Sequence, residues 1–127
     1  GPLLDRIDLV VEVPRVKFDH LTADAPAESS AAVRARVLAA RSRQGRRYLD
    51  RGIHTNAEMT IKDLKEFSSP DASGRELLRT AVHQLRLSAR AYHRLLKVSR
   101  TIADLEGADR VLQPHIAEAL TYRAKVE

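Results

Sequence analysis

The sequence predicts a mainly α-helical bundle of four to five helices, preceded by one short strand left over from a larger sheet. Three observations lead to this prediction. Apolar residues recur at helical spacing from residue 29 onward, capping residues flank the candidate helices, and β-branched residues cluster near the start of the chain. We therefore divide the chain into a strand segment (1–13), a linker (14–28) and a helical bundle (29–127).

The strand prediction depends on the run from Asp8 to Val13, which is rich in valine and ends at Pro14. A single strand cannot satisfy its own backbone hydrogen bonds, and no later segment looks like a partner. We therefore expect the rest of its sheet to lie outside this chain. The linker prediction depends on Pro14, Pro26 and the scattered polar residues between them.

The first predicted helix is capped by Ser29 or Ser30 and runs to about Tyr48. One side of it carries Val33, Val37, Ala40 and Gln44. Three arginines fall on the neighbouring side at helical spacing: Arg36, Arg43 and Arg47. Such a row is most often a solvated face, and the alternative is a contact with DNA or with another partner.

Two shorter helices follow. The first runs from Thr60 to Phe67, with Thr60 and Asp63 as a weak capping box. The second is opened by a box of Ser73 and Glu76 and runs to about Arg86. Its amphipathic stripe predicts a core of Leu77, Leu78, Ala81, Val82 and Leu85.

A longer helix is predicted next, capped by Ser88, running to about Glu106 and closed by Gly107. Its buried face is predicted as Ala91, Tyr92, Leu95, Val98, Ser99, Ile102 and Leu105. Its polar face is predicted as Arg90, Arg94, Lys97, Thr101 and Asp104. Pro114 suits the first turn of a last helix that turns Ile116, Ala119 and Leu120 inward.

Composition excludes several functions. The 127 residues include no cysteine, so the chain has no disulfide and no thiolate metal site, and its five histidines are scattered singly. The chain contains no phosphate-binding glycine loop and no G-x-S-x-G motif, so alone it looks like a non-enzyme. No apolar run approaches the roughly 18–20 residues of a membrane span, so we expect a cytoplasmic protein with no membrane partner. A net charge of +5 admits an anionic partner without identifying it.

Two segments carry a family resemblance. Residues 2–9 (PLLDRIDL), followed by Val11-Glu12-Val13-Pro14, resemble the stretch before the last core strand of AAA+ ATPases of the magnesium-chelatase and MCM helicase group. Residues 87–98 (LSARAYHRLLKV), continued by 100–107 (RTIADLEG), resemble the sensor-2 helix of magnesium chelatase-like proteins of the ComM/YifB type. Residues 115–123 (HIAEALTYR) also fit that group.

The resemblance implies that residues 29–127 are the C-terminal helical lid of an AAA+ ATPase and that residues 1–13 end its core. It implies that Arg6 is an arginine finger acting in trans and that Arg90 is the sensor-2 contact to an ATP phosphate. An arginine suits both roles because its planar, permanently charged fork grips phosphate oxygens. Without the resemblance, Arg6 reads as a surface ion pair with Asp5 or Asp8, and Arg90 as a solvated charge.

The resemblance further implies ATP and Mg²⁺ in the parent protein, with neither bound tightly by the chain alone. It implies a homo-hexamer in which the lid contacts the AAA+ core of its own chain and of neighbouring subunits. The parent is expected to process DNA, for example by branch migration; pigment synthesis ranks lower because RTIADLEG is closer to the competence branch. The alternatives are a stand-alone basic module that binds nucleic acid and a purely structural oligomerisation domain. Scarce aromatic residues weaken the first of these.

Overall fold

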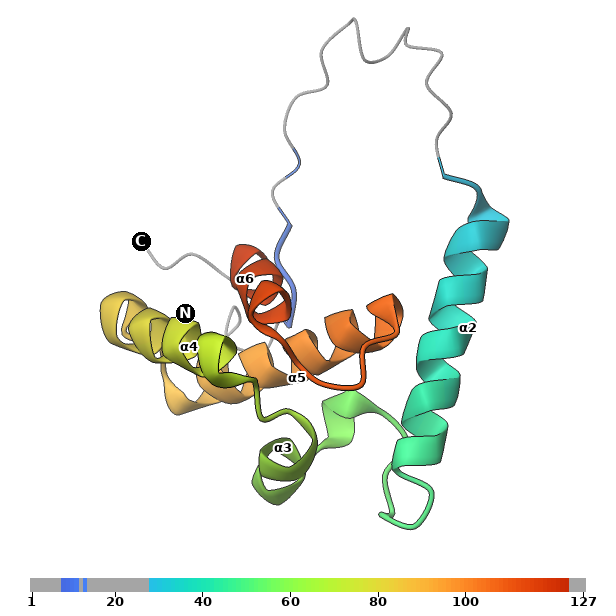
Figure 1. Ribbon diagram of the computed structural model, residues 1–127, viewed down its shortest axis with the longest axis horizontal. Helices are drawn as coiled ribbons and strands as arrows, with labels where there is room; N and C mark the ends of the chain where they lie inside the picture. The colour runs from blue at the N-terminus through green and yellow to red at the C-terminus, as the bar shows by residue number, and fades with distance from the viewer. Residues whose placement is uncertain (1–7, 12, 14–27, 124–127) are drawn as a thin grey trace, which may run out of the picture.

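The computed structural model describes residues 8–11, 13 and 28–123 of the chain. These residues form five α-helices and one 3₁₀ turn (Figure 1). In chain order they are α2 (Ser30–Arg47), η2 (Asn56–Glu58), α3 (Ile61–Phe67), α4 (Ala72–Leu85), α5 (Ala89–Glu106) and α6 (Gln113–Thr121). The predicted helical bundle is confirmed.

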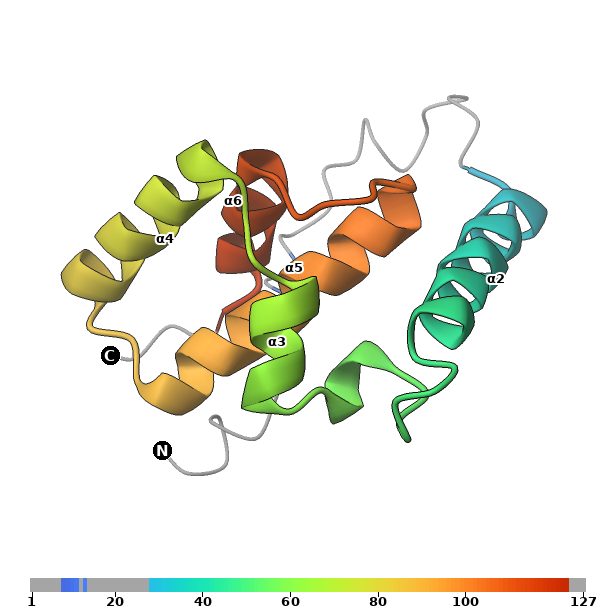
Figure 2. The same cartoon turned by 60° about the horizontal axis from the view of Figure 1, so that its bottom comes forward.

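Helix α5 is the centre of the bundle. It packs against α2, η2, α3 and α6, and α4 packs against α6. Figures 1 and 2 show α2 standing beside the carboxyl end of α5, with α4 at the opposite end of the molecule. Helix α5 therefore connects the two ends of the bundle.

The caps explain why the helices begin and end where they do. The hydroxyls of Ser29 and Ser88 accept the backbone N–H groups three residues further on, each at 3.1 Å. Thr60 and Asp63 form the predicted reciprocal box, and Gly107 ends α5 in the left-handed conformation at φ +83°. These predictions are confirmed. The sequence could predict the caps because each depends only on neighbouring residues.

The predicted start of α4 is wrong. The N-cap is Asp71, whose Oδ1 accepts the N–H of Gly74 at 2.8 Å, so Ser73 lies inside the first turn. Asp71 also donates its own N–H to the carbonyl of Val111, which fixes the entry of α4 against the loop before α6. That long-range bond selects Asp71 over Ser73.

The predicted leftover strand is not formed by the described residues of its segment, 8–11 and 13. Instead, the N–H of Val10 donates to the carbonyl of Tyr122 at 2.6 Å, just beyond α6. The physical reason is the lack of a neighbouring strand within the described residues, so this backbone finds a partner in a turn. Most of the predicted linker, residues 14–27, lies outside the described residues.

The core is mostly aliphatic. Its buried members are Tyr48, Met59, Leu64, Leu78, Leu95, Leu96, Ala103, Val111, Ile116 and Ala119. The predicted faces of α5 need two corrections: Leu105 is 38% exposed and Asp104 is 1% exposed. Arg100, which neither predicted face includes, is 2% exposed. Polar groups from α2 and η2 cover that side of α5, so it buries charge rather than leucine. No helix in the described residues is long and apolar enough to cross a membrane.

Candidate functional site

Arg90 lies in the first turn of α5, and its side chain is exposed. The turn has the Ser88 cap and contains no acidic residue. The unpaired amides of a helix amino end carry partial positive charge, which an acidic residue in the first turn commonly neutralises. Here a guanidinium adds to that charge, so the surface around Arg90 suits an anion.

Arg94 lies one turn after Arg90 and is already engaged. Its Nε is 3.3 Å from Oδ1 of Asp8, and its side chain is only 15% exposed. The contact holds the described part of the amino-terminal segment against α5. Arg6, the predicted arginine finger, lies outside the described residues.

The three arginines predicted as a row on α2 have different surroundings. Arg36 forms an exposed two-bond pair with Glu28. Nη1 of Arg43 is 3.7 Å from Oδ1 of Asp109. Arg47 points into the molecule, where its side chain is 14% exposed. The three therefore form no continuous solvated face, and their contact with nucleic acid stays a prediction.

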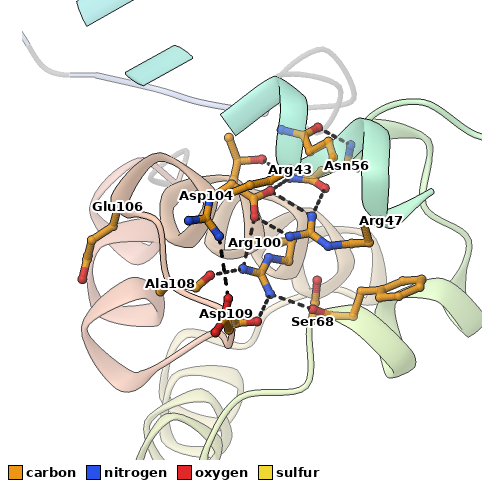
Figure 3. Close-up of polar contacts among 12 residues, drawn as sticks. Arg43, Arg47, Asn56, Ser68, Arg100, Asp104, Glu106, Ala108 and Asp109 are labelled. Carbon is orange, nitrogen blue, oxygen red and sulfur yellow. Dashed lines mark hydrogen bonds and ion pairs between the residues drawn. The ribbon is translucent and has the colours of Figure 1, made fainter. Parts of the chain in front are cut away.

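Arg47 belongs to a buried charged cluster between α2, η2 and α5 (Figure 3). Its two terminal nitrogens donate to the two oxygens of Asp104, at 3.0 and 2.5 Å. Nη2 of Arg100 lies 3.1 Å from the same carboxylate. Two guanidinium groups thus surround one carboxylate whose side chain is fully buried.

Asn56, at the start of η2, completes the cluster. Its amide nitrogen donates to Asp104 Oδ2 at 2.9 Å and to Thr101 Oγ1 at 3.0 Å. Its amide oxygen accepts the Tyr48 hydroxyl at 2.6 Å. Its backbone N–H donates to Gln44 Oε1 at 2.9 Å. A single asparagine therefore joins α2, η2 and α5.

Arg100 also fixes the loop after α5. Its terminal nitrogens donate to the backbone carbonyls of Phe67, Ala108 and Asp109, at 2.8 to 3.2 Å. Its Nε finds no hydrogen-bond partner among the described residues. The side chain acts as a buried brace between α3, α5 and the loop before α6.

The electrostatics follow from this arrangement. Burial lowers the pKa of Arg47, but interactions with Asp104, and to a smaller extent with Tyr48, together outweigh burial and raise it. Burial lowers the pKa of Arg100, which the charge of Asp104 offsets only in part. Burial raises the pKa of Tyr48. Both arginines nevertheless stay charged at neutral pH, so the cluster keeps a positive excess in the interior.

The sequence pattern does not predict this cluster. Its charged groups bind one another and hold the helices together, so the cluster has a structural role. Helical periodicity places Asp104 on a polar face, and nothing nearby in the sequence names Arg47 as its partner. The described residues contain no group of three His, Cys, Asp or Glu side chains that could hold a metal ion. Among the predicted site residues that the structure describes, Arg36, Arg43 and Arg47 are ion-paired, whereas Arg90 is exposed. Arg90 is therefore the candidate for binding an anionic ligand.

Comparisons with known proteins agree with the sequence resemblance. The family model for magnesium chelatase, subunit ChlI C-terminal, matches residues 27–123. The chain is 45% identical to competence protein ComM of Haemophilus influenzae, covering 99% of this chain and 24% of that protein. It is 40% identical to an uncharacterized protein, YifB, of Escherichia coli, covering 98% and 24%.

An uncharacterized protein of Mycobacterium tuberculosis is 37% identical, over 97% of this chain and 24% of that protein. The chain thus spans about a quarter of the length of these relatives. Because the family model matches most of the chain and these relatives match nearly all of it, this chain belongs to the magnesium chelatase ChlI C-terminal family, as a domain of the ComM/YifB type.

Proposed function

We propose that this chain is the helical lid of an AAA+ ATPase and that Arg90 contacts a phosphate of ATP bound to the parent protein. The observation that carries the proposal is the exposed guanidinium of Arg90 in a helix turn with no acidic residue. Bound ATP with Mg²⁺ supplies the phosphoryl group that is transferred to water. Arg90 would hold its phosphate oxygens through a bidentate fork and sense whether the phosphate is present.

Arg6 has the complementary role in this proposal. It would reach from one subunit to the nucleotide of the next and stabilise the charge that develops during phosphoryl transfer. In GTPases such an arginine is worth about 10³–10⁵ in rate. The lid and its neighbour would then respond to the same nucleotide.

The proposed process is remodelling of DNA by the parent protein, such as branch migration of incoming DNA. Its support is the relative named as a competence protein, with which this chain shares 45% identity. The subunits would form a homo-hexamer, as the family resemblance implies. The chain alone, without a nucleotide-binding core, should hydrolyse no ATP, and turnover by a clean preparation would contradict the proposal.

The decisive experiment substitutes Arg90 in the full-length parent protein. Arg90→Ala should lower ATP turnover by about 10²–10³-fold, the usual loss when one preorganised charge donor is removed. Arg90→Lys should recover only part of the rate, because lysine keeps the charge and loses the fork. Arg79→Ala is the matched control: Arg79 is an exposed arginine on α4, and its ion pair with Glu76 is solvated. Equal turnover in the Arg90 and Arg79 variants would reject the sensor role.

A second experiment tests Arg6. Arg6→Ala should reduce turnover while ATP still binds. Mixing this variant with subunits that bind ATP without hydrolysing it, and that keep Arg6, should restore activity. A mixture with no recovered activity would exclude action between subunits. If neither arginine matters for turnover, the structural oligomerisation domain becomes the better interpretation.

A further inference from the structure

We propose that the outward side of α2 contacts the phosphate backbone of duplex DNA through Arg34, Arg41 and Arg46. The proposal rests on the DNA-processing function proposed above and assigns a DNA-contacting surface to the lid itself. It also replaces the arginines that helical spacing first indicated with a different set on the same helix.

Charge is the first observation. Helix α2 contains six arginines and no acidic residue. Arg36, Arg43 and Arg47 are each paired with a carboxylate, as described above. The other three arginines are exposed, and no carboxylate of the described residues forms an ion pair with them. The charges of Arg36, Arg43 and Arg47 are thus compensated within the described residues, and those of the other three arginines are not.

Placement is the second observation. Arg34 and Arg41 are seven residues apart, so they lie on the same side of α2, about 10 Å from each other along the axis. Arg46 lies on the other flank of the exposed face, about 140° around the helix from Arg41. The exposed positions between the flanks include Leu38, which is 55% exposed, and four small residues, namely Ala31, Ala35, Ser42 and Gly45. Toward the carboxyl end of this face, Ser42 and Gly45 lie between Arg41 and Arg46 and leave room for a polyanion to approach the helix closely.

The chemistry of the surface favours duplex DNA over a single strand. Helix α2 contains no aromatic residue, and Tyr48 next to it is 1% exposed. Binding of single strands commonly depends on aromatic faces for base stacking. Contacts to a duplex backbone need only cations, and the arginine fork matches phosphate geometry.

The test is duplex binding by this chain, measured by fluorescence anisotropy with a labelled mixed-sequence duplex at increasing salt. The variant removes three charges at once: Arg34→Gln, Arg41→Gln and Arg46→Gln. The matched control removes three exposed arginines elsewhere: Arg75→Gln, Arg79→Gln and Arg86→Gln. Both variants have the same net charge, and circular dichroism with thermal melting establishes that both remain folded.

Each phosphate contact contributes about −0.9 to the slope of log affinity against log salt concentration. The α2 variant should therefore lose about 2 to 3 units of slope and about 10- to 100-fold in affinity at low salt. The control variant should keep most of the salt slope and most of the affinity of the unmodified chain. An equal loss in the two variants would show that only net charge matters, and no loss in either would remove α2 from the interface.

Two further outcomes would overturn the proposal. One is tighter binding to a single strand than to the duplex. The other is binding to polyglutamate with the affinity and salt slope seen for DNA, which would indicate an acidic protein partner. Because the assay involves no ATP, its failure leaves the Arg90 proposal intact, and failure of the Arg90 experiment leaves this result standing.

Discussion

Asp104 and Arg47 are separated by 57 positions in the chain, yet two hydrogen bonds of 2.5 and 3.0 Å join them in the interior. Taking both charges out of water is unfavourable, and their attraction repays this only with good geometry and further hydrogen bonds. Arg100 and Asn56 supply those further contacts. We infer that the cluster determines which side of α5 meets α2, more than it adds net stability.

Removing the carboxylate should destabilise the fold strongly. Asp104→Ala leaves the guanidinium groups of Arg47 and Arg100 buried without their anion. The free energy of unfolding should fall by about 3–5 kcal/mol, measured by urea denaturation. Asp109→Ala is the control, because its side chain is fully exposed, and it should change the free energy by less than about 0.5 kcal/mol. Equal midpoints for the two variants would show that the cluster is not coupled to folding.

Asn56 should matter almost as much, although it carries no charge. Asn56→Ala removes the acceptor of the Tyr48 hydroxyl and two donors to α5, so buried polar groups lose their partners. We expect a loss of about 2–3 kcal/mol by urea denaturation. Gln84→Ala, which removes an exposed amide on α4, should be nearly neutral. A small effect at Asn56 would mean that water replaces the lost bonds.

Two glycines inside helices should respond to alanine with opposite signs. Gly45 lies on the exposed side of α2, and a Cβ there meets nothing within 4 Å. Gly45→Ala should therefore raise the free energy of unfolding by about 0.5–1 kcal/mol through helix propensity. A Cβ on Gly74 would lie 2.7 Å from Asp71 Oδ1 and 2.8 Å from Pro70 Cβ. Gly74→Ala should lower stability by about 1–2 kcal/mol, because it disrupts the cap of α4.

Thermal melting of the two single variants tests whether Gly45→Ala raises the melting temperature and Gly74→Ala lowers it. Stabilisation by Gly74→Ala would contradict the role of Asp71 as the cap. Destabilisation by Gly45→Ala would mean that the exposed side of α2 is covered in solution.

Glu58 should contribute to the loss of stability in acid. Hydrogen bonds from the backbone N–H groups of His54 and Thr55 and from the Thr55 hydroxyl lower the pKa of Glu58. Because the folded pKa is depressed, the contribution of Glu58 is complete above the ordinary glutamate pKa. It is lost as the pH falls from there through the folded pKa. Glu58→Gln should therefore show a weaker decline of melting temperature over that acidic range.

The control for this prediction is Glu118→Gln, an exposed glutamate on α6 outside the η2 turn. Its acid profile should follow that of the unmodified chain. A Glu58→Gln profile identical to it would assign the acid loss to other carboxylates.

The helices could be predicted from sequence because their signals are local. Ser29, Ser88 and Gly107 act on backbone groups within a few residues, so reading along the chain finds them. Asp71 was missed because its choice over Ser73 depends on a hydrogen bond with distant Val111.

The interior of the α2–α5 contact could not be predicted for the same reason. A periodic pattern assigns charged residues to solvent, and Arg100 and Asp104 violate that rule only because partners arrive from η2, α2 and distant loops. Arg90 was identified through family resemblance, and its position in the first turn of α5 agrees with the predicted Ser88 cap.

The uneven burial of α2 has a mechanical consequence. Ala40 and Gln44 are at most 9% exposed, whereas Val33 is 41% and Leu38 is 55% exposed. Within the described residues, the carboxyl half of α2 therefore packs against the bundle, whereas its amino half projects away from it (Figure 1). A chromophore or a crosslinker attached at residues 31–38 would report on whatever approaches the lid while leaving the hydrophobic core untouched.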